Sequence, residues 1–157
     1  MIQSFVIFPI IKDLLLATVL GVLIGLERKI VQGEAGMRTF GLISLGSALF
    51  LMIERVPMII YSDISNADSL RILGQIIGQV VVGIGFLGAG VIIFQEREGK
   101  VKGLTTAAVM WVTAAIGAAV GLQLYDIAII ATIFVLLINT ILLPIEKIID
   151  KKENEKK

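Results

Sequence analysis

The side chains best suited to chemistry are charged groups at the ends of long apolar runs. Glu27, Arg28 and Arg38 lie at one junction between two such runs, while Asp68 and Arg71 stand at the start of another. A charge inside hydrocarbon costs about 2.5 to 3.5 kcal/mol or more, so charges this close to apolar runs need water or a partner. Two interpretations stay open. These residues are interface anchors and helix caps, or they form the pairs Glu27–Arg38 and Asp68–Arg71.

Two amides carry the second chemical signal. Gln75 and Gln79 follow Arg71 at four-residue spacing and Gly83 continues the pattern, so these residues lie on roughly one helix face. A buried amide in hydrocarbon needs a hydrogen bond from a neighbouring helix, so this face is expected to meet protein or water. The amides then either hold helices together or line a polar path. Their candidate partners are polar residues of the later apolar runs: Thr105, Thr106, Thr113 and Asn139.

The residue types that are missing exclude several classes of protein. The chain has no Cys and no His, which excludes disulfides, thiolate chemistry, ordinary zinc sites and a Ser-His-Asp triad. Nothing resembles a nucleophile beside its base, so we predict that the protein is not an enzyme and has no cofactor other than Mg²⁺. Mg²⁺ keeps several waters and needs only one or two carboxylates. Glu27 and Asp68 are therefore the candidate metal ligands.

These side chains belong to a chain that is too apolar for a soluble domain of its size. It has 157 residues, 57% of them hydrophobic, and a mean hydropathy of +0.95. We predict an all-α membrane bundle of about five transmembrane helices over residues 1–147, followed by a charged cytoplasmic tail at 148–157. Pro57 is expected to break the second helix, and Pro144 with Glu146 and Lys147 to end the last span. The first apolar run, 2–26, is interrupted by Lys12 and Asp13, and its span is expected to begin near Pro9. The other apolar runs are 39–53, 72–94, 103–125 and 127–145.

The distribution of Lys and Arg predicts the orientation. With five spans, eleven of the fourteen basic residues fall on one side, and only Lys12, Arg55 and Arg71 fall on the other. Loops rich in Lys and Arg stay in the cytoplasm. The C-terminus is therefore expected inside and the N-terminus outside.

Glycines are concentrated in the third apolar run, at Gly83, Gly85, Gly88 and Gly90. Gly83-x-Gly85-x-x-Gly88 matches a dinucleotide-binding pattern, but it lacks the preceding strand and the later acidic residue that this motif requires. We interpret these glycines as sites of close helix packing, with Trp111 against them. Further small-residue faces occur at Gly21/Gly25, Gly74/Gly78 and Gly117/Gly121.

Four motifs together resemble the MgtC/SapB family of bacterial inner-membrane proteins. They are Gly25-Leu-Glu-Arg28, Gly36-Met-Arg-Thr39, Gly83-Ile-Gly-Phe-Leu-Gly-Ala-Gly90 and Gly99-Lys-Val-Lys-Gly-Leu-Thr-Thr-Ala-Ala108 before Trp111. The resemblance implies a five-span membrane domain in the cytoplasmic membrane, here expected without the family's C-terminal cytoplasmic domain. It also implies a polar site at Glu27, Arg28, Arg38, Thr39, Gln79, Thr105 and Thr106.

The resemblance implies two possible functions. The family is linked to growth and virulence under magnesium limitation and is often labelled as a magnesium transporter, which favours Mg²⁺ transport or sensing. Its best-known member resembles a regulator that restrains the ATP synthase, which favours helix contacts with a larger membrane complex. The same small-residue faces could form a homodimer. No nucleic-acid partner is expected.

Overall fold

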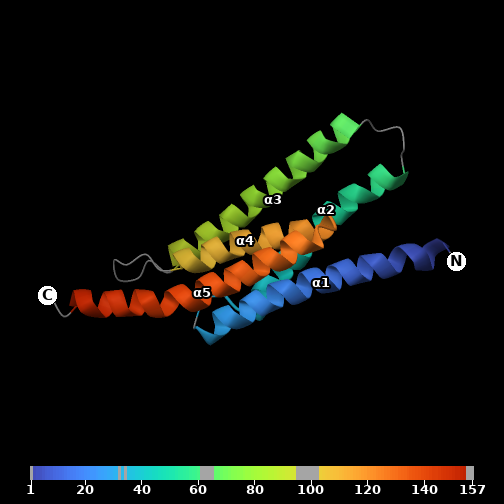
Figure 1. Cartoon of the computed structure of the whole chain (residues 1–157). Helices are drawn as coiled ribbons and strands as arrows, with labels where there is room; N and C mark the ends of the chain where they lie inside the picture. The colour runs from blue at the N-terminus through green and yellow to red at the C-terminus, as the bar shows by residue number, and fades with distance from the viewer. Residues whose placement is uncertain (1, 32, 34, 61–65, 95–102, 155–157) are drawn as a thin grey trace.

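The computed structural model describes residues 2–31, 33, 35–60, 66–94 and 103–154. In these ranges the chain forms helices and no strand (Figure 1). The helices are α1 (Ile2–Ile30), α2 (Met37–Ile60), α3 (Asn66–Phe94), α4 (Leu104–Gly121) and α5 (Tyr125–Asn154). The predicted all-α architecture of five helices is confirmed over the described part of the chain.

Four of the described helices are long and apolar enough to cross a membrane. The candidate spans are Ile7–Ile30, Leu70–Ile93, Leu104–Gly121 and Tyr125–Ile145, and a shorter apolar segment covers Met37–Ile53 of α2. The chain is therefore a multi-pass membrane protein in contact with lipid. The orientation of its ends stays a prediction.

The prolines do not end the helices in which they lie. The backbone of α2 continues past Pro57 to Ile60, so the predicted break there is wrong. Pro57 lies in the last turn of α2, where a missing N–H removes only one hydrogen bond near the frayed end. In α5 the apolar span ends at Ile145, close to the predicted place, but the helix continues past Pro144 to Asn154.

The central element of the bundle is α4. It contacts each of the other described helices, and half of its apolar span is buried. Its sequence is rich in Ala and Gly, which lets four neighbours approach the backbone closely. Buried side chains around it include Phe40, Ile24, Leu51, Ile116 and Val120.

Close helix crossings occur at glycines of α1 and α4, where each meets α2. A Cβ at Gly21 would lie 2.5 Å from the Phe40 carbonyl oxygen, and one at Gly25 would lie 2.6 Å from the Met37 Cα. Gly117 faces the backbone of Ser44 even more closely. The predicted small-residue faces Gly21/Gly25 and Gly117/Gly121 are thus confirmed as contacts within one chain.

The glycines of α3 behave differently. A Cβ at Gly88 would lie 3.3 Å from the Ala107 side chain, but nothing lies within 4 Å of one at Gly83, Gly85 or Gly90. The prediction of tight packing at these three glycines is wrong within this chain, because α3 contacts α4 and α2 and diverges from α1 (Figure 1). Trp111 is 50% exposed and does not fill them.

Candidate functional site

Three predicted polar residues line one open groove between α2 and α3, which we call the α2–α3 groove. Arg38 and Thr39 lie in the first turn of α2, and Gln79 projects from the middle of α3. The groove has a volume of about 840 Å³. Its other walls are almost entirely apolar and include Leu42, Phe50, Ile53, Ile76, Ile84 and Leu87.

Arg71 and Gln75 lie outside this groove. Each four-residue step turns a helix by about 40°, so the stripe from Arg71 to Gly83 winds around α3 instead of staying on one face. Gln79 and Gly83 line the groove, whereas Arg71 and Gln75 are exposed on a different side of the helix. The stripe was expected to meet protein or water, and in this single chain only its Gln79–Gly83 part lines a groove between helices.

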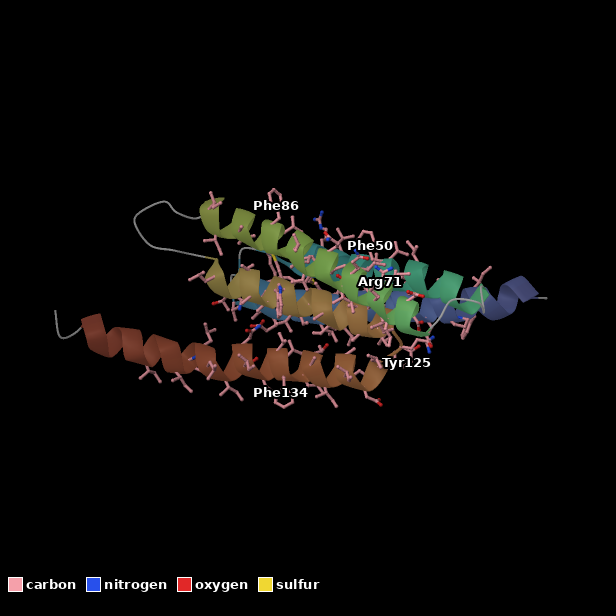
Figure 2. All side chains as sticks on the ribbon, turned by 90° about the horizontal axis from the view of Figure 1, so that it is seen from above. Phe50, Arg71, Phe86, Tyr125 and Phe134 are labelled. Carbon is pink, nitrogen blue, oxygen red and sulfur yellow. The ribbon has the colours of Figure 1, made fainter. Side chains whose placement is uncertain are left out.

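The outer face of α3 comprises Arg71, Gln75, Gly78, Val82, Gly85 and Phe86. All of these residues are exposed, and the open glycines Gly78 and Gly85 leave shallow depressions along the face. Phe86, which is 80% exposed, points away from the bundle (Figure 2). On the far side of the bundle Phe134 of α5 points outward in the same way.

Glu27 pairs with an amide of α5 and not with an arginine. Asn139 Nδ2 donates a 2.8 Å hydrogen bond to Glu27 Oε2, and Oε1 is buried with no hydrogen-bond partner among the described atoms. The predicted Glu27–Arg38 ion pair is wrong for the described part of the chain, because Arg38 faces the α2–α3 groove while Glu27 faces α5.

Arg28 folds back over the loop that follows α1. It is buried, and the Cβ of a residue replacing Gly33 would meet its guanidinium at 3.1 Å. Gly33 N donates a 2.7 Å hydrogen bond to the Arg28 carbonyl, which closes the turn. Gly33 therefore leaves the room in which the Arg28 side chain lies.

The threonines and Asn139 are not the partners of the α3 amides. Thr113 donates to the Val109 carbonyl one turn earlier in α4, and Asn139 is engaged with Glu27. Thr105 is exposed and Thr106 is buried at the start of α4. Gln75 and Gln79 are exposed, and within the described part of the chain no hydrogen bond joins either amide to Thr113 or Asn139.

A joint metal site of Glu27 and Asp68 is not formed. Glu27 lies near the end of α1 and Asp68 in the first turn of α3, as predicted, but these helices do not touch and the two ends lie on opposite sides of the molecule (Figure 1). Among the described residues no group of three or more His, Cys, Asp or Glu side chains could hold a metal ion.

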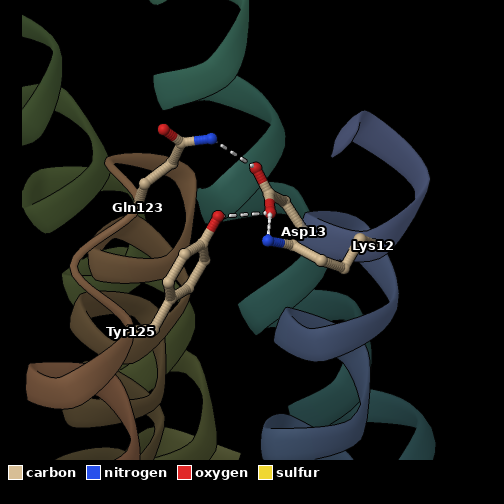
Figure 3. Close-up of polar contacts among 4 residues, drawn as sticks. All are labelled: Lys12, Asp13, Gln123 and Tyr125. Atoms are coloured by element: carbon tan, nitrogen blue, oxygen red, sulfur yellow. Dashed lines mark hydrogen bonds and ion pairs between the residues drawn. The ribbon is translucent and has the colours of Figure 1, made fainter. Parts of the chain in front are cut away.

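The most extensive polar cluster involves a residue that sequence reasoning missed as a functional side chain. Asp13 of α1 is 1% exposed and accepts hydrogen bonds from Tyr125 Oη at 2.7 Å and from Gln123 Nε2 at 3.3 Å (Figure 3). Lys12 Nζ lies 3.7 Å from Asp13 Oδ1 and 4.4 Å from the centroid of the Tyr125 ring. We call these four residues the Asp13 cluster. The sequence feature that could have identified Asp13 is a carboxylate that interrupts an apolar run.

Comparison with known proteins identifies the family of the chain. The model of the MgtC family matches residues 14–148, which is most of the chain. The chain belongs to the MgtC family. As an MgtC-family protein with several apolar spans, it is a multi-pass bacterial membrane protein.

Several curated proteins share substantial identity with this MgtC-family chain. Protein SrpB of Synechococcus elongatus is 45% identical over 130 residues, 79% of this chain and 69% of SrpB. Protein MgtC of Salmonella typhimurium is 44% identical over 141 residues, 89% of this chain and 55% of that protein. "Putative magnesium transporter YhiD" of Escherichia coli is 40% identical over 126 residues, 80% of this chain and 56% of YhiD.

The chain thus spans little more than half the length of two of these relatives. No solved structure matches the chain significantly.

Proposed function

We propose that this protein serves magnesium homeostasis by binding another membrane protein through the outer face of α3, without catalysing a reaction. The link to magnesium is supported by the name of the relative YhiD and by membership of the MgtC family. The mode of action is supported by the separation of the polar residues. Glu27, Gln79 and Asp68 face three different surroundings, which is unfavourable for an ion path inside one bundle.

The main observation that supports this proposal is the exposure of Gln75. Its amide lies on an apolar helix whose span is only 11% buried, so it faces the lipid. A polar group in hydrocarbon without a hydrogen bond is costly, and an approaching helix with polar side chains removes that cost. Gly78 and Gly85 on the same face let a second backbone come close.

The partner is expected to be a larger membrane complex such as the ATP synthase. A helix bound along this face would contact Gln75, Val82 and Phe86 and would cover an apolar surface that α3 exposes. A second copy of the chain is the competing occupant, because the same small-residue face can pack against itself.

Photocrosslinking in native membranes tests this function. A photoreactive residue at Val82 should yield a crosslinked hetero-complex, and Gly78→Leu should abolish it by filling the depression. Phe134 is the matched control position, since it is comparably exposed on α5. Crosslinks equally strong from Phe134, or crosslinks only to a second copy, would contradict the hetero-complex.

A second candidate function is Mg²⁺ transport. The observation that favours it is the buried Glu27 Oε1, a carboxylate oxygen with no partner among the described atoms. Carboxylate oxygens are ligands that Mg²⁺ prefers. Proteoliposomes containing a Mg²⁺-sensitive dye test this candidate. A flux that is lost with Glu27→Gln and kept with Asp68→Asn supports transport, whereas flux no greater than in empty vesicles excludes it.

A further inference from the structure

In the α2–α3 groove, the described residues combine apolar walls with the cationic side chain of Arg38 at one end. Its apolar part extends from Leu42 to Ile53 along α2 and is closed on the other side by Ile76 and Leu87 of α3. Arg38 is the only charged side chain among the described residues that line it. The occupant that fits these walls has a long apolar body and an anionic end.

The dimensions of the groove suit one leaflet of a bilayer. From Arg38 to Phe50 the helix rises by about 18 Å at about 1.5 Å per residue. Half of a hydrocarbon core is about 15 Å thick. An acyl chain whose head group lies at Arg38 therefore ends within the groove, near the middle of the membrane.

The electrostatics of the mouth favour an anion. Arg38 is exposed, and no ion pair engages it within the described residues. It lies in the first turn of α2, where backbone N–H groups are unpaired, the helix dipole is positive and no acidic residue is present. The next residue, Thr39, also lines the groove. A phosphate group bound here would neutralise the charge of Arg38 and interact favourably with the positive end of the α2 dipole.

We propose that the α2–α3 groove binds an anionic phospholipid, with its phosphate on Arg38 and one acyl chain between α2 and α3. The predicted orientation puts Arg38 in the cytoplasmic leaflet, whose anionic lipids bind basic pockets between transmembrane helices. The α2–α3 groove and the outer face lie on different sides of α3.

Two glycines keep the groove open. Gly46 on α2 and Gly83 on α3 both line it, and nothing lies within 4 Å of a Cβ built at either position. A larger side chain at Gly83 therefore fits without clashing with the protein and occupies the space assigned to the acyl chain. This makes Gly83→Leu a variant that removes the lipid without disturbing the bundle.

Quenching of tryptophan fluorescence by brominated lipids tests the site. The chain has a single tryptophan, Trp111, which is half-exposed on α4. The protein carrying Trp111→Phe and Leu42→Trp would report from the groove in vesicles of phosphatidylcholine mixed with brominated phosphatidylglycerol. We expect brominated phosphatidylglycerol to be preferred over brominated phosphatidylcholine by roughly five-fold, the factor that one cation contributes at a membrane surface.

Variants distinguish the head-group site from general lipid contact. Arg38→Gln should abolish the preference, Arg38→Lys should retain most of it, and Arg71→Gln, which changes an exposed cation outside the groove, should leave it intact. Gly83→Leu should weaken quenching by both lipids, whereas Gly78→Leu on the outer face should not.

Two results would overturn the proposal. Equal quenching by the two brominated lipids would mean that the groove meets only bulk lipid. Quenching by neither lipid, together with a crosslink from Leu42 to a second copy, would mean that a helix fills the groove. Gly78→Leu and Gly83→Leu change different sides of α3. A failure of the lipid proposal therefore leaves the proposed binding of a partner at the outer face unaffected, and a failure of partner binding leaves the lipid proposal unaffected.

Discussion

At the scale of single residues, Asp13 shows how a carboxylate can be buried inside an apolar bundle. Its two oxygens accept hydrogen bonds from Tyr125 and Gln123, and the Lys12 ammonium lies close to Oδ1 (Figure 3). Gln123 adopts a left-handed backbone with φ of 63°, which makes the turn after α4 tight enough to place both donors beside α1. The cluster joins α1 to the turn between α4 and α5 and to the first residue of α5.

The first prediction concerns the Tyr125 hydroxyl. Tyr125→Phe should lower the free energy of unfolding in detergent by about 1 to 3 kcal/mol, because it removes a donor from a buried carboxylate. Unfolding by SDS followed by circular dichroism measures this change. Asp126→Asn, which alters an exposed acid in the same turn, is the control and should shift stability by less than about 0.5 kcal/mol. Equal stability of Tyr125→Phe and the parent protein would contradict this role.

The second prediction concerns the Glu27–Asn139 pair. Asn139→Leu should destabilise the bundle by about 1 to 3 kcal/mol, because it removes the hydrogen-bond donor of Glu27 Oε2 from a carboxylate whose Oε1 is already buried without a partner among the described atoms. The double variant Glu27→Leu/Asn139→Leu should recover much of that loss, since replacing both polar partners removes the unpaired group. The same unfolding assay measures both. Additive losses would show that the two residues do not interact.

At the scale of helices, the contact between α2 and α4 holds the bundle together. Gly117 and Gly121 of α4 face Ser44 and Ala48 of α2, and the Cβ of any larger residue would collide with their backbones. Backbone atoms cannot move aside as flexible side chains can. These two glycines therefore fix how closely the two helices approach.

A matched pair of substitutions tests this contact. Gly117→Ala should destabilise by about 1 to 3 kcal/mol through overpacking. Gly85→Ala on α3 should stabilise by about 0.4 to 1 kcal/mol, because nothing lies near its Cβ and alanine has less freedom in the unfolded chain. Thermal unfolding in detergent compares the two variants. A loss of stability in Gly85→Ala would show that α3 is packed tightly in detergent.

At the scale of the whole molecule, the bundle is asymmetric. α1, α2 and α4 form a compact group, α5 lies along one side, and α3 diverges from α1 (Figure 1). The apolar span of α3 is only 11% buried, so its outer face and its groove are uncovered. Such exposed helices are sites where lipids and partner helices bind. The two proposed binding surfaces lie on different sides of α3.

The orientation of the molecule is the fourth prediction. Because the chain has no cysteine, single cysteines report position without background. In intact cells a membrane-impermeant maleimide should label Asp68→Cys, while Lys29→Cys should be labelled only after permeabilisation. Labelling of Lys29→Cys in intact cells would reverse the orientation.

The sequence predicted the helices well and their contacts poorly. The apolar runs predicted the spans, and Gly21/Gly25 and Gly117/Gly121 were identified as packing faces. Gly83, Gly85 and Gly90 look equally suitable in sequence, yet in the structure they are open. Similarly, Glu27 was predicted to form an ion pair with Arg38, whereas its hydrogen-bond partner Asn139 is 112 residues away in the sequence. Both errors concern which side of one helix meets another.

What the sequence determined by itself is the number of helices, their membrane environment and the family, because hydropathy and motifs act along the chain. The tertiary structure alone decided which glycines are covered, that Asp13 is buried against Tyr125, and that a groove opens at Arg38. The physical reason lies in the solvent. Lipid is as apolar as a helix interface, so the hydropathy of a membrane helix does not show which of its sides packs against another helix.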